Sequence, residues 1–503
     1  QSGGSLDYLW DYVPNWIGTP RNASIVPSRV GPVLPESNNV ETVLPVVNAS
    51  GRGLNLSLSL VHNSKGSFVN GTQVSGSPLP SYPAAGFNLG FGYIVTYTSS
   101  FSPFDTGYMY IKPDGTPVYL GHGSASTVGT YTANDGSHIV YTGNALNGGS
   151  ITFPNGSVMS MSVLNNYIQP TQMMDTNGDY MTFAYEDSSQ GYSPLALASI
   201  TDTLGRIDTF NYDALKRLSS ISTPAQGGGT TQLWLFTYGT NSLTVEEGNQ
   251  NGMSFTTGST SQTIGIVRGG TVQASATFNY TSGSNPTLTG WSESPGGSYS
   301  ITSSTNTSAK TITFTITRPD SSTLNLTRST DTTSVANGLM TQSEIKNSSS
   351  ASMHKTVFTY ASDPGGGKQV TNTATYDDTG AAIQTAFQYN SGGFVTVKQE
   401  YGYSSSIQRQ TNVSYVTAGG AFKPSEIDVY DETVIPAKPA AKKTYTYDNY
   451  AALGGMQDYG GTANPPGHLS GYDASQTNRG NVTGETDWYD IANNLSITRL
   501  AQI

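Results

Sequence analysis

The chain has 503 residues, of which 35% are hydrophobic and only 11% charged, and it contains 57 glycines, 31 tyrosines and no cysteine. The absence of cysteine excludes disulfides, a cysteine nucleophile and thiolate metal sites. The 23 basic and 34 acidic residues give a net charge of −11, which argues against nucleic acid as a partner, because nucleic-acid-binding surfaces are basic.

The composition favours an all-β fold with little or no helix. Aromatic residues make up 10% of the chain and ionisable groups are few, whereas disordered chains combine few aromatics with high charge. No segment approaches the roughly 20 apolar residues that cross a bilayer, so we expect no membrane span. The polar start at Gln1 is what signal-peptide cleavage would leave, and we expect a secreted, extracellular or cell-surface protein.

Residues 1–50 differ from the rest of the chain and are predicted to form an extended docking arm. Several prolines follow one another between residues 20 and 45, and proline is excluded from central strands. An aromatic cluster precedes them, which needs a partner surface on this chain or on a neighbouring copy. The cluster consists of Tyr8, Trp10, Tyr12 and Trp16.

From residue 51 onward, strand signals continue to the end of the chain. In residues 54–60 leucine alternates with polar residues, which places the leucines on one face of a strand. Asn-Gly and Asp-Gly pairs then recur between strands and favour tight hairpins. We therefore predict an N-terminal β-region over 51–170, leading into antiparallel hairpin repeats over 171–503. Only 437–443, beside two prolines, is interpreted as a linker.

An internal repeat supports this division. Residues 175–186 align without a gap on 202–213, with matching Asp, Thr, Gly, Thr, Phe and Tyr. The repeat contains an aromatic-X-Tyr element whose two rings share one face of a strand, so we expect that face to be buried and the other to be wet. Copies of the element include Phe183 with Tyr185 and Phe210 with Tyr212, and end at Tyr238, Tyr280, Tyr360, Tyr389 and Tyr447.

The best copy resembles the Rhs or YD repeat. Gly205-Arg206 precedes a patterned strand that ends in Tyr212-Asp213, and Arg217-Leu218 opens the next strand, with Lys216 where the repeat usually has Gly. The resemblance is strong over 171–222 and weaker elsewhere. It implies an antiparallel β-ribbon that spirals into a hollow, cocoon-like shell, as in teneurin and toxin-complex shells, which often enclose a toxin.

No catalytic, cofactor-binding or metal-ligating residue is predicted. The five histidines are scattered and have no metal-ligand spacing. The pattern Asp175-X-Asn177-X-Asp179 resembles the start of a calcium loop but lacks the distant bidentate Glu, so a hairpin turn explains it better.

The sequence thus favours a non-enzymatic secreted shell or surface-assembly protein. We expect a homo-oligomer or polymer formed through the arm and the C-terminal sheet edge at residues 494–500, since neither a closing segment nor a toxin domain is recognised after the repeats. Three alternatives stay open. They are a glycan-binding adhesin module with exposed Tyr108, Tyr110 and Tyr119, a shell fragment of a polymorphic toxin, and an enzyme built on a β-solenoid.

Overall fold

The computed structural model confirms the all-β fold class, with 60% strand and 3% helix. No helix in the part of the chain that it describes is long and apolar enough to cross a membrane. The described residues are 25–68, 73–74, 77–78, 80–98, 106–133, 135–224, 231–283, 286–362, 368–403, 405–434, 437–456, 465–470, 472, 475–491 and 493–500.

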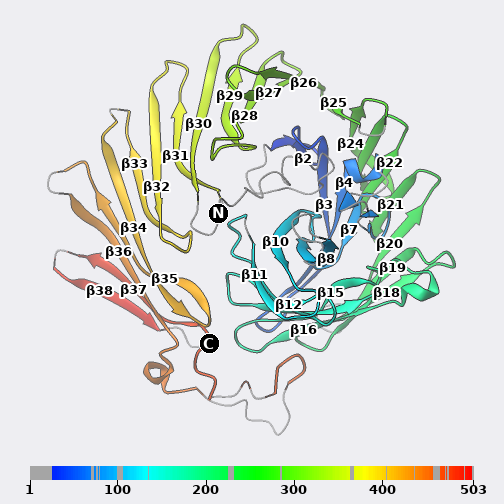
Figure 1. Ribbon diagram of the computed structural model, residues 1–503, viewed down its shortest axis with the longest axis horizontal. Coiled ribbons are helices and arrows are strands. Elements are labelled where there is room, and N and C mark those ends of the chain that lie inside the picture. Colours follow the sequence, from blue (N-terminus) through cyan, green and yellow to red (C-terminus); the bar gives the residue numbers. More distant parts are fainter. Residues whose placement is uncertain are drawn as a thin grey trace.

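A large antiparallel sheet of 31 strands forms most of the molecule, and its strands do not close into a barrel over the described ranges. Sequential strands pair with one another through hairpin after hairpin, from β11 (Gly129–Thr132) to β38 (Leu495–Leu500). The resulting ribbon curves around an interior (Figure 1). An additional pairing, Ile168 with Ile94, joins β15 (Tyr167–Met174) to β8 (Tyr93–Thr98).

The remaining strands of the large sheet are 5 to 12 residues long. Those before residue 300 are β9 (Thr106–Ile111), β10 (Pro117–Gly123), β12 (Val140–Asn144), β13 (Gly148–Thr152), β14 (Val158–Leu164), β16 (Tyr180–Tyr185), β17 (Leu197–Thr201), β18 (Ile207–Tyr212), β19 (Leu218–Thr223), β20 (Gln232–Tyr238), β21 (Ser242–Glu247), β22 (Gly252–Thr257), β23 (Ser261–Arg268), β24 (Thr271–Tyr280), β25 (Leu288–Ser294) and β26 (Ser298–Asn306). Those after it are β27 (Thr311–Thr317), β28 (Thr323–Ser329), β29 (Met340–Lys346), β30 (Ser352–Ser362), β31 (Lys368–Tyr376), β32 (Ala382–Tyr389), β33 (Val395–Tyr401), β34 (Ile407–Ala418), β35 (Ala421–Asp431), β36 (Lys438–Tyr447) and β37 (Val482–Asp490).

A five-stranded sheet lies inside the curve of the ribbon, against its first half (Figure 1). Its strands, in spatial order, are β1 (Val26–Ser28), β2 (Gly31–Leu34), β3 (Asn39–Ala49), β4 (Leu56–Asn63) and β7 (Phe87–Leu89). The other described elements are the helix α2 (Ser64–Phe68), the two-stranded β5 (Gln73–Val74) with β6 (Ser77–Pro78), and the 3-10 turns η1 (Ser188–Gln190) and η2 (Tyr450–Leu453).

The structure corrects the predicted arm at its C-terminal half. Residues 26–49 are not extended on a surface but form β1 to β3, and β2 and β3 are internal strands of the five-stranded sheet. Pro32 is accepted in β2, a strand of four residues, and Pro45 lies beside a register shift in β3, where the ladder lacks a regular partner. The aromatic cluster of the arm, residues 8–16, lies outside the described residues.

The predicted linker at 437–443 is also wrong. Residues 438–447 form β36, which pairs with β35 and β37. Pro439 lies opposite Tyr430, next to a register shift between Val429 and Tyr430. A bulge of this kind removes the need for one backbone N–H, so the ribbon continues across the proline.

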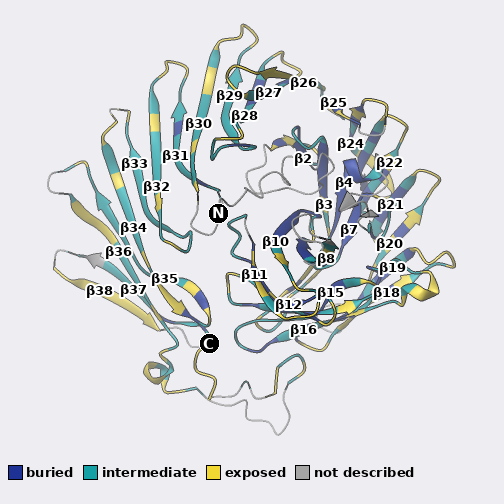
Figure 2. Cartoon of the chain, in the orientation of Figure 1, coloured by how far each residue is buried: buried dark blue, intermediate teal, exposed yellow. Residues whose placement is uncertain are grey.

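The core lies between the five-stranded sheet and the first half of the ribbon. Leu58, Phe210, Phe278 and Trp291 belong to one cluster and are each at most 3% exposed. Side chains in strands β29 to β38 are mostly half-buried or exposed, and Figure 2 shows this asymmetry as dark blue on one side of the ring. The inner face of the ribbon is therefore packed where the small sheet covers it.

Candidate functional site

The tyrosine of the aromatic-X-Tyr element coincides with a β-bulge. In β18, Asn211 pairs with Ser220 but Tyr212 pairs with Leu218, which leaves Ser219 as the extra residue. The Ser219 hydroxyl donates a hydrogen bond of 3.0 Å to the carbonyl oxygen of Asn211. This bond gives the Asn211 carbonyl group a hydrogen-bond partner where the bulge interrupts the backbone pairing of β18 and β19.

The same bulge recurs along the ribbon at every other predicted tyrosine except Tyr238, which pairs without a register shift. A hydroxyl residue occupies the bulge in most copies and bonds to the carbonyl of the residue before the tyrosine. The pairs are Thr289 with Asn279, Thr371 with Thr359, Thr396 with Gln388, and Thr483 with Thr446. At Tyr185 the extra residue is Ala198.

The tyrosine hydroxyls connect successive hairpins. The hydroxyl of Tyr389 donates to the carbonyl oxygen of Val370 at 2.5 Å, and Val370 is the cross-strand partner of Tyr360. Tyr415 bonds in the same way to Val395, the partner of Tyr389. Tyr447 bonds to Pro424, the partner of Tyr415. Each tyrosine therefore ties its strand to the bulge of the preceding hairpin, and we call this series the tyrosine ladder.

In the first half of the ribbon the ladder is modified by the inner sheet. Tyr212 donates to the carbonyl oxygen of Leu197 at 2.6 Å and shares a hydrogen bond with Tyr82, which follows the inner sheet's strand β4 in the chain. Tyr280 donates to Ser64 Oγ of α2 at 2.6 Å. Burial raises the pKa of both phenols above their ordinary value. These tyrosines are therefore neutral contacts between ribbon and inner sheet at physiological pH.

Three of the other predicted repeat residues are buried and a fourth is half-buried. Phe183 and Phe210 are buried on the inner face, where Phe183 stacks on Phe91 at 4.2 Å. Leu218 is fully buried. Tyr185 is half-buried, and burial raises the pKa of its phenol.

Tyr360 and Tyr238 differ in their hydroxyl contacts. Tyr360 donates to the carbonyl oxygen of Met340 at 2.6 Å, and burial raises its pKa to about 12. The guanidinium carbon of Arg217 lies over the Tyr238 ring, 4.5 Å from the ring centroid. The buried hydroxyl of Tyr238 lacks a hydrogen-bond partner among the described residues.

Two tight turns carry the charged part of the repeat. Asp213 Oδ1 accepts the backbone N–H groups of Leu215 and Arg217, and Asp213 Oδ2 accepts Arg217 Nε at 2.8 Å. Asp202 makes the equivalent bonds to Leu204 and Arg206. The aspartate therefore orders the turn backbone and holds the arginine that follows it.

The fourth position of these turns requires a left-handed backbone. Gly205 has φ +78°, as the turn prediction requires, and the equivalent Lys216 has φ +61°. Lysine is strained in that region, which explains why the resembling repeats use glycine there. Asp175 bonds to the backbone N–H groups of Asn177 and Asp179 in the same way, so this pattern forms a turn. Among the described residues no group of acidic or histidine side chains could hold a metal ion.

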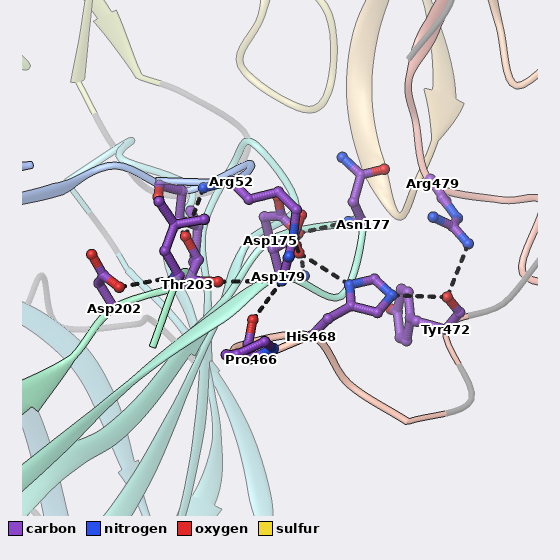
Figure 3. Close-up of polar contacts among 12 residues, drawn as sticks. Arg52, Asp175, Asn177, Asp179, Asp202, Thr203, Pro466, His468, Tyr472 and Arg479 are labelled. Atoms are coloured by element: carbon purple, nitrogen blue, oxygen red, sulfur yellow. Dashed lines mark hydrogen bonds and ion pairs between the residues drawn. The ribbon is translucent and has the colours of Figure 1, made fainter. Parts of the chain in front are cut away.

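The site that joins the most distant parts of the chain is a polar junction, formed by Arg52, Asp179, Thr203, Pro466 and His468 (Figure 3). Arg52 lies between β3 and β4, Asp179 and Thr203 lie in turns of the early ribbon, and Pro466 and His468 precede β37. The junction therefore brings the inner sheet, the early ribbon and the late chain together.

Arg52 is the central donor of the junction. Its Nε bonds to Asp179 Oδ1 at 2.7 Å, and its Nη2 bonds to the carbonyl oxygens of Pro466 at 2.6 Å and Thr203 at 3.2 Å. His468 Nδ1 lies 3.0 Å from the same Asp179 oxygen. The Asp179 side chain is 8% exposed and that of Arg52 is 34% exposed, so the pair is partly shielded from water.

Backbone and amide bonds extend the junction on both sides. Tyr180 N–H donates to the carbonyl oxygen of Gly467 at 2.7 Å, and Leu469 N–H donates to that of Gly178 at 2.8 Å. Asn481 Nδ2 donates to Asn177 Oδ1 at 2.6 Å. These bonds attach the segment before β37 to the turn between β15 and β16, so the end of the ribbon is fixed to its beginning.

Buried carboxyl groups accompany the junction. Burial and, to a smaller extent, the nearby Asp202 carboxylate raise the pKa of Asp208 to about 6 against the opposing effect of Arg206. Burial also raises the pKa of Asp175.

The tyrosines proposed for an exposed binding groove are not exposed. Tyr108, Tyr110 and Tyr119 are 0%, 3% and 6% exposed, and Tyr108 and Tyr110 belong to a second core. Tyr108 stacks on Tyr131 at 4.5 Å, and its hydroxyl donates to the carbonyl oxygen of Ser124. That version of the adhesin hypothesis is therefore wrong.

Sequence reasoning did not find Arg52 or His468. Both act through contacts with residues more than 120 positions away, and neither belongs to a repeated pattern.

Comparisons with known proteins do not assign a family. No protein-family model and no curated protein matches the chain. Among solved structures, the chain is similar to the TcdB2-TccC3-TEV chain, with 10% identity and a TM-score of 0.37 over 92% of this chain and 22% of that chain. It is also similar to the N-terminal domain of the effector SpvB from Salmonella typhimurium, with 10% identity and a TM-score of 0.18 over 67% of this chain and 98% of that one.

The chain thus spans about a fifth of the TcdB2-TccC3-TEV chain that it matches. Likenesses at these scores assign neither a family nor an activity.

Proposed function

We propose that this protein is a non-enzymatic, secreted structural shell of the Rhs or YD-repeat kind, whose ribbon encloses an interior or builds an extracellular surface assembly. The observation that carries the proposal is the tyrosine ladder. It repeats one hairpin unit along a curved sheet and is joined by the polar junction into a ring. A repeated unit of this kind is suited to the wall of a shell, because each unit contacts only its neighbours along the ribbon.

The absence of enzymatic activity is part of the same proposal. The polar groups of the junction bond to backbone and to one another, and the perturbed carboxyl Asp208 lies beside Arg206 and Asp202.

Electron microscopy of the purified protein and of the native particle tests this proposal. We expect a hollow ring or shell, and we expect the Arg52→Ala variant to show opened rings, because the junction then loses its central donor. A solid globular particle in wild type would contradict the proposal. Intact mass of the native particle distinguishes a free-standing assembly from the shell part of a toxin.

Assembly through the sheet edge is tested separately by light scattering. β38 pairs with β37, and the Leu495, Ile497 and Leu500 side chains are each at least 45% exposed. We expect concentration-dependent oligomers in wild type and their loss in Ile497→Lys, because charge on an exposed strand discourages strand pairing. Identical scattering curves for the two proteins would remove self-assembly through β38 from the proposal.

A further inference from the structure

The outer face of the ribbon carries aromatic side chains on four alternate strands. They are Tyr376 in β31, Tyr401 in β33, Tyr430 in β35 and Trp488 in β37. All four are half-buried. We call these four residues the outer diagonal.

Register determines that this face points outward. Phe314 belongs to the inner face, and its cross-strand partners lead through Leu326 and Ser343 to Thr356 of β30. Lys355, the neighbour of Thr356, therefore lies on the outer face. It pairs with Tyr376, and its Nζ lies 4.3 Å from the centroid of that ring.

Register also places the rings at regular intervals. From Tyr376 to Tyr401 the path crosses β32, where Ala382 pairs with Tyr376 and Gln384 pairs with Tyr401. Each aromatic is thus displaced by two strands and two residues from the previous one. Strand spacing and residue rise make this step about 12 Å.

The same displacement leads to the remaining two rings. Gln399, two residues from Tyr401, pairs with Gln410, which pairs with Tyr430. Asp428, two residues from Tyr430, pairs with Lys442, which pairs with Trp488. The outer diagonal is therefore a straight row across seven strands.

Neutral amides lie between two of the rings, Tyr401 and Tyr430. Tyr401 donates its hydroxyl hydrogen to Gln399 Oε1 at 3.0 Å, Gln399 Nε2 donates to Gln410 Oε1 at 2.7 Å, and Gln410 Nε2 donates to Asn412 Oδ1 at 3.0 Å. Amides retain further donors and acceptors after these bonds, so they can bind a ligand that carries many hydroxyl groups.

Charged groups on this face are paired with one another. Lys442 Nζ lies 2.8 Å from Glu426 Oε2 and 3.6 Å from Asp428 Oδ1, which neutralises the ammonium group. The row therefore has no concentrated charge that would select a polyanion or a polycation.

We propose that the outer diagonal binds an extended, uncharged polysaccharide. The faces of pyranose rings present C–H groups that pack on aromatic rings, and their hydroxyl edges suit amides. A regular row on a flat sheet fits a chain ligand with repeating units, whereas a small molecule needs a concave pocket. This inference does not depend on the shell function, since it concerns only the outer surface.

Sedimentation with amorphous cellulose and with colloidal chitin, and affinity electrophoresis in xylan, glucomannan and dextran, test the proposal with the full-length protein. We expect at least one polysaccharide to retain wild type. We expect Tyr430→Ala and Trp488→Ala each to weaken retention at least tenfold, and Tyr430→Phe to preserve it because the ring makes the contact.

Tyr403→Ala is the matched control. Tyr403 is 65% exposed and lies two residues beyond Tyr401, but it is in a turn outside the diagonal. Its removal should leave retention unchanged, and thermal melting should show that all variants are folded.

Three results would overturn the proposal. They are no retention on any of the five polysaccharides, equal loss with Tyr403→Ala, and retention that survives both diagonal alanine variants. Light scattering supplies a further test. If wild type forms oligomers that the diagonal variants abolish, the face binds a second copy of this chain and the glycan proposal is wrong.

Discussion

Tyr389 donates its hydroxyl hydrogen to the carbonyl oxygen of Val370, 2.5 Å away, on the residue that pairs with Tyr360. The bond connects two hairpins that are consecutive in the repeat. We expect Tyr389→Phe to lower the free energy of unfolding by about 1 kcal/mol, because one intramolecular hydrogen bond is lost and a carbonyl group is left unpaired. Denaturant unfolding measures this difference.

Tyr238→Phe is the matched control for that variant. The hydroxyl of Tyr238 is buried and has no hydrogen-bond partner in the described part of the chain. Its removal should be neutral or slightly stabilising, since an unpaired polar group leaves the interior. Equal losses at the two positions would contradict the tyrosine ladder.

A second prediction concerns the contact between a ribbon turn and the late chain. Gly205 has φ +78°, and a Cβ added there would lie 2.9 Å from Cβ of Pro466. Gly205→Ala should therefore cost the left-handed strain of about 1–2 kcal/mol and, in addition, the displacement of the segment around Pro466. Gly205→Val should cost more.

Gly380→Ala separates these two effects. Gly380 has φ +84° in an equivalent turn, but a Cβ there would meet nothing within 4 Å. The additional loss of thermal stability in Gly205→Ala, relative to Gly380→Ala, measures the contact with Pro466. Faster proteolysis of the chain before β37 should accompany it in Gly205→Ala alone, and equal behaviour of the two variants would argue against the contact.

A third prediction follows from Lys216, which has φ +61° in a position that favours glycine. Lys216 also contacts Tyr192, with Nζ 3.1 Å from the hydroxyl oxygen, so its substitution changes two things at once. Comparing Lys216→Gly with Lys216→Ala cancels the lost contact. The glycine variant should be more stable than the alanine variant by about 1 kcal/mol, although glycine is ordinarily the less stable of the two. The reverse order in chemical denaturation would contradict a left-handed backbone at Lys216.

The sequence predicted what depends on local pattern. Alternation, Asn-Gly turns and the aromatic-X-Tyr element are properties of neighbouring residues, and the all-β fold followed from them. The same reasoning failed for Pro32, Pro45 and Pro439, because the acceptability of a proline depends on whether its particular ladder position requires an N–H group.

The polar junction and the outer diagonal could not be predicted because they depend on distant register. Arg52 meets Pro466 across 414 positions, and no local pattern selects that pair. Tyr401 and Tyr430 fall into one row only because bulges beside them fix the pairing of three successive strands. A shift of one residue in either pairing would have sent a ring to the other face.

The last prediction concerns pH and Asp208, whose carboxyl group is 3% exposed and has a pKa raised to about 6 by burial and by Asp202. In the unfolded chain this pKa is about 3.9. Below pH 4 the carboxyl is protonated in both states, and its stabilising effect is complete. As the pH rises through 6, the unfolded chain has already ionised while the folded chain must release its proton inside, so stability is lost.

Asp208→Asn removes this dependence while keeping the size of the side chain. We expect the free energy of unfolding of the variant to equal or fall below that of wild type at pH 4 and to exceed it at pH 8. The difference between the two proteins should change by up to about 3 kcal/mol between these pH values. Urea unfolding at closely spaced pH values measures the difference curve, and its midpoint should fall between pH 4 and 6. A difference that stays constant from pH 4 to 8 would mean that Asp208 ionises equally easily in both states, and the buried carboxyl beside the junction would then have no part in the acid stability of the ribbon.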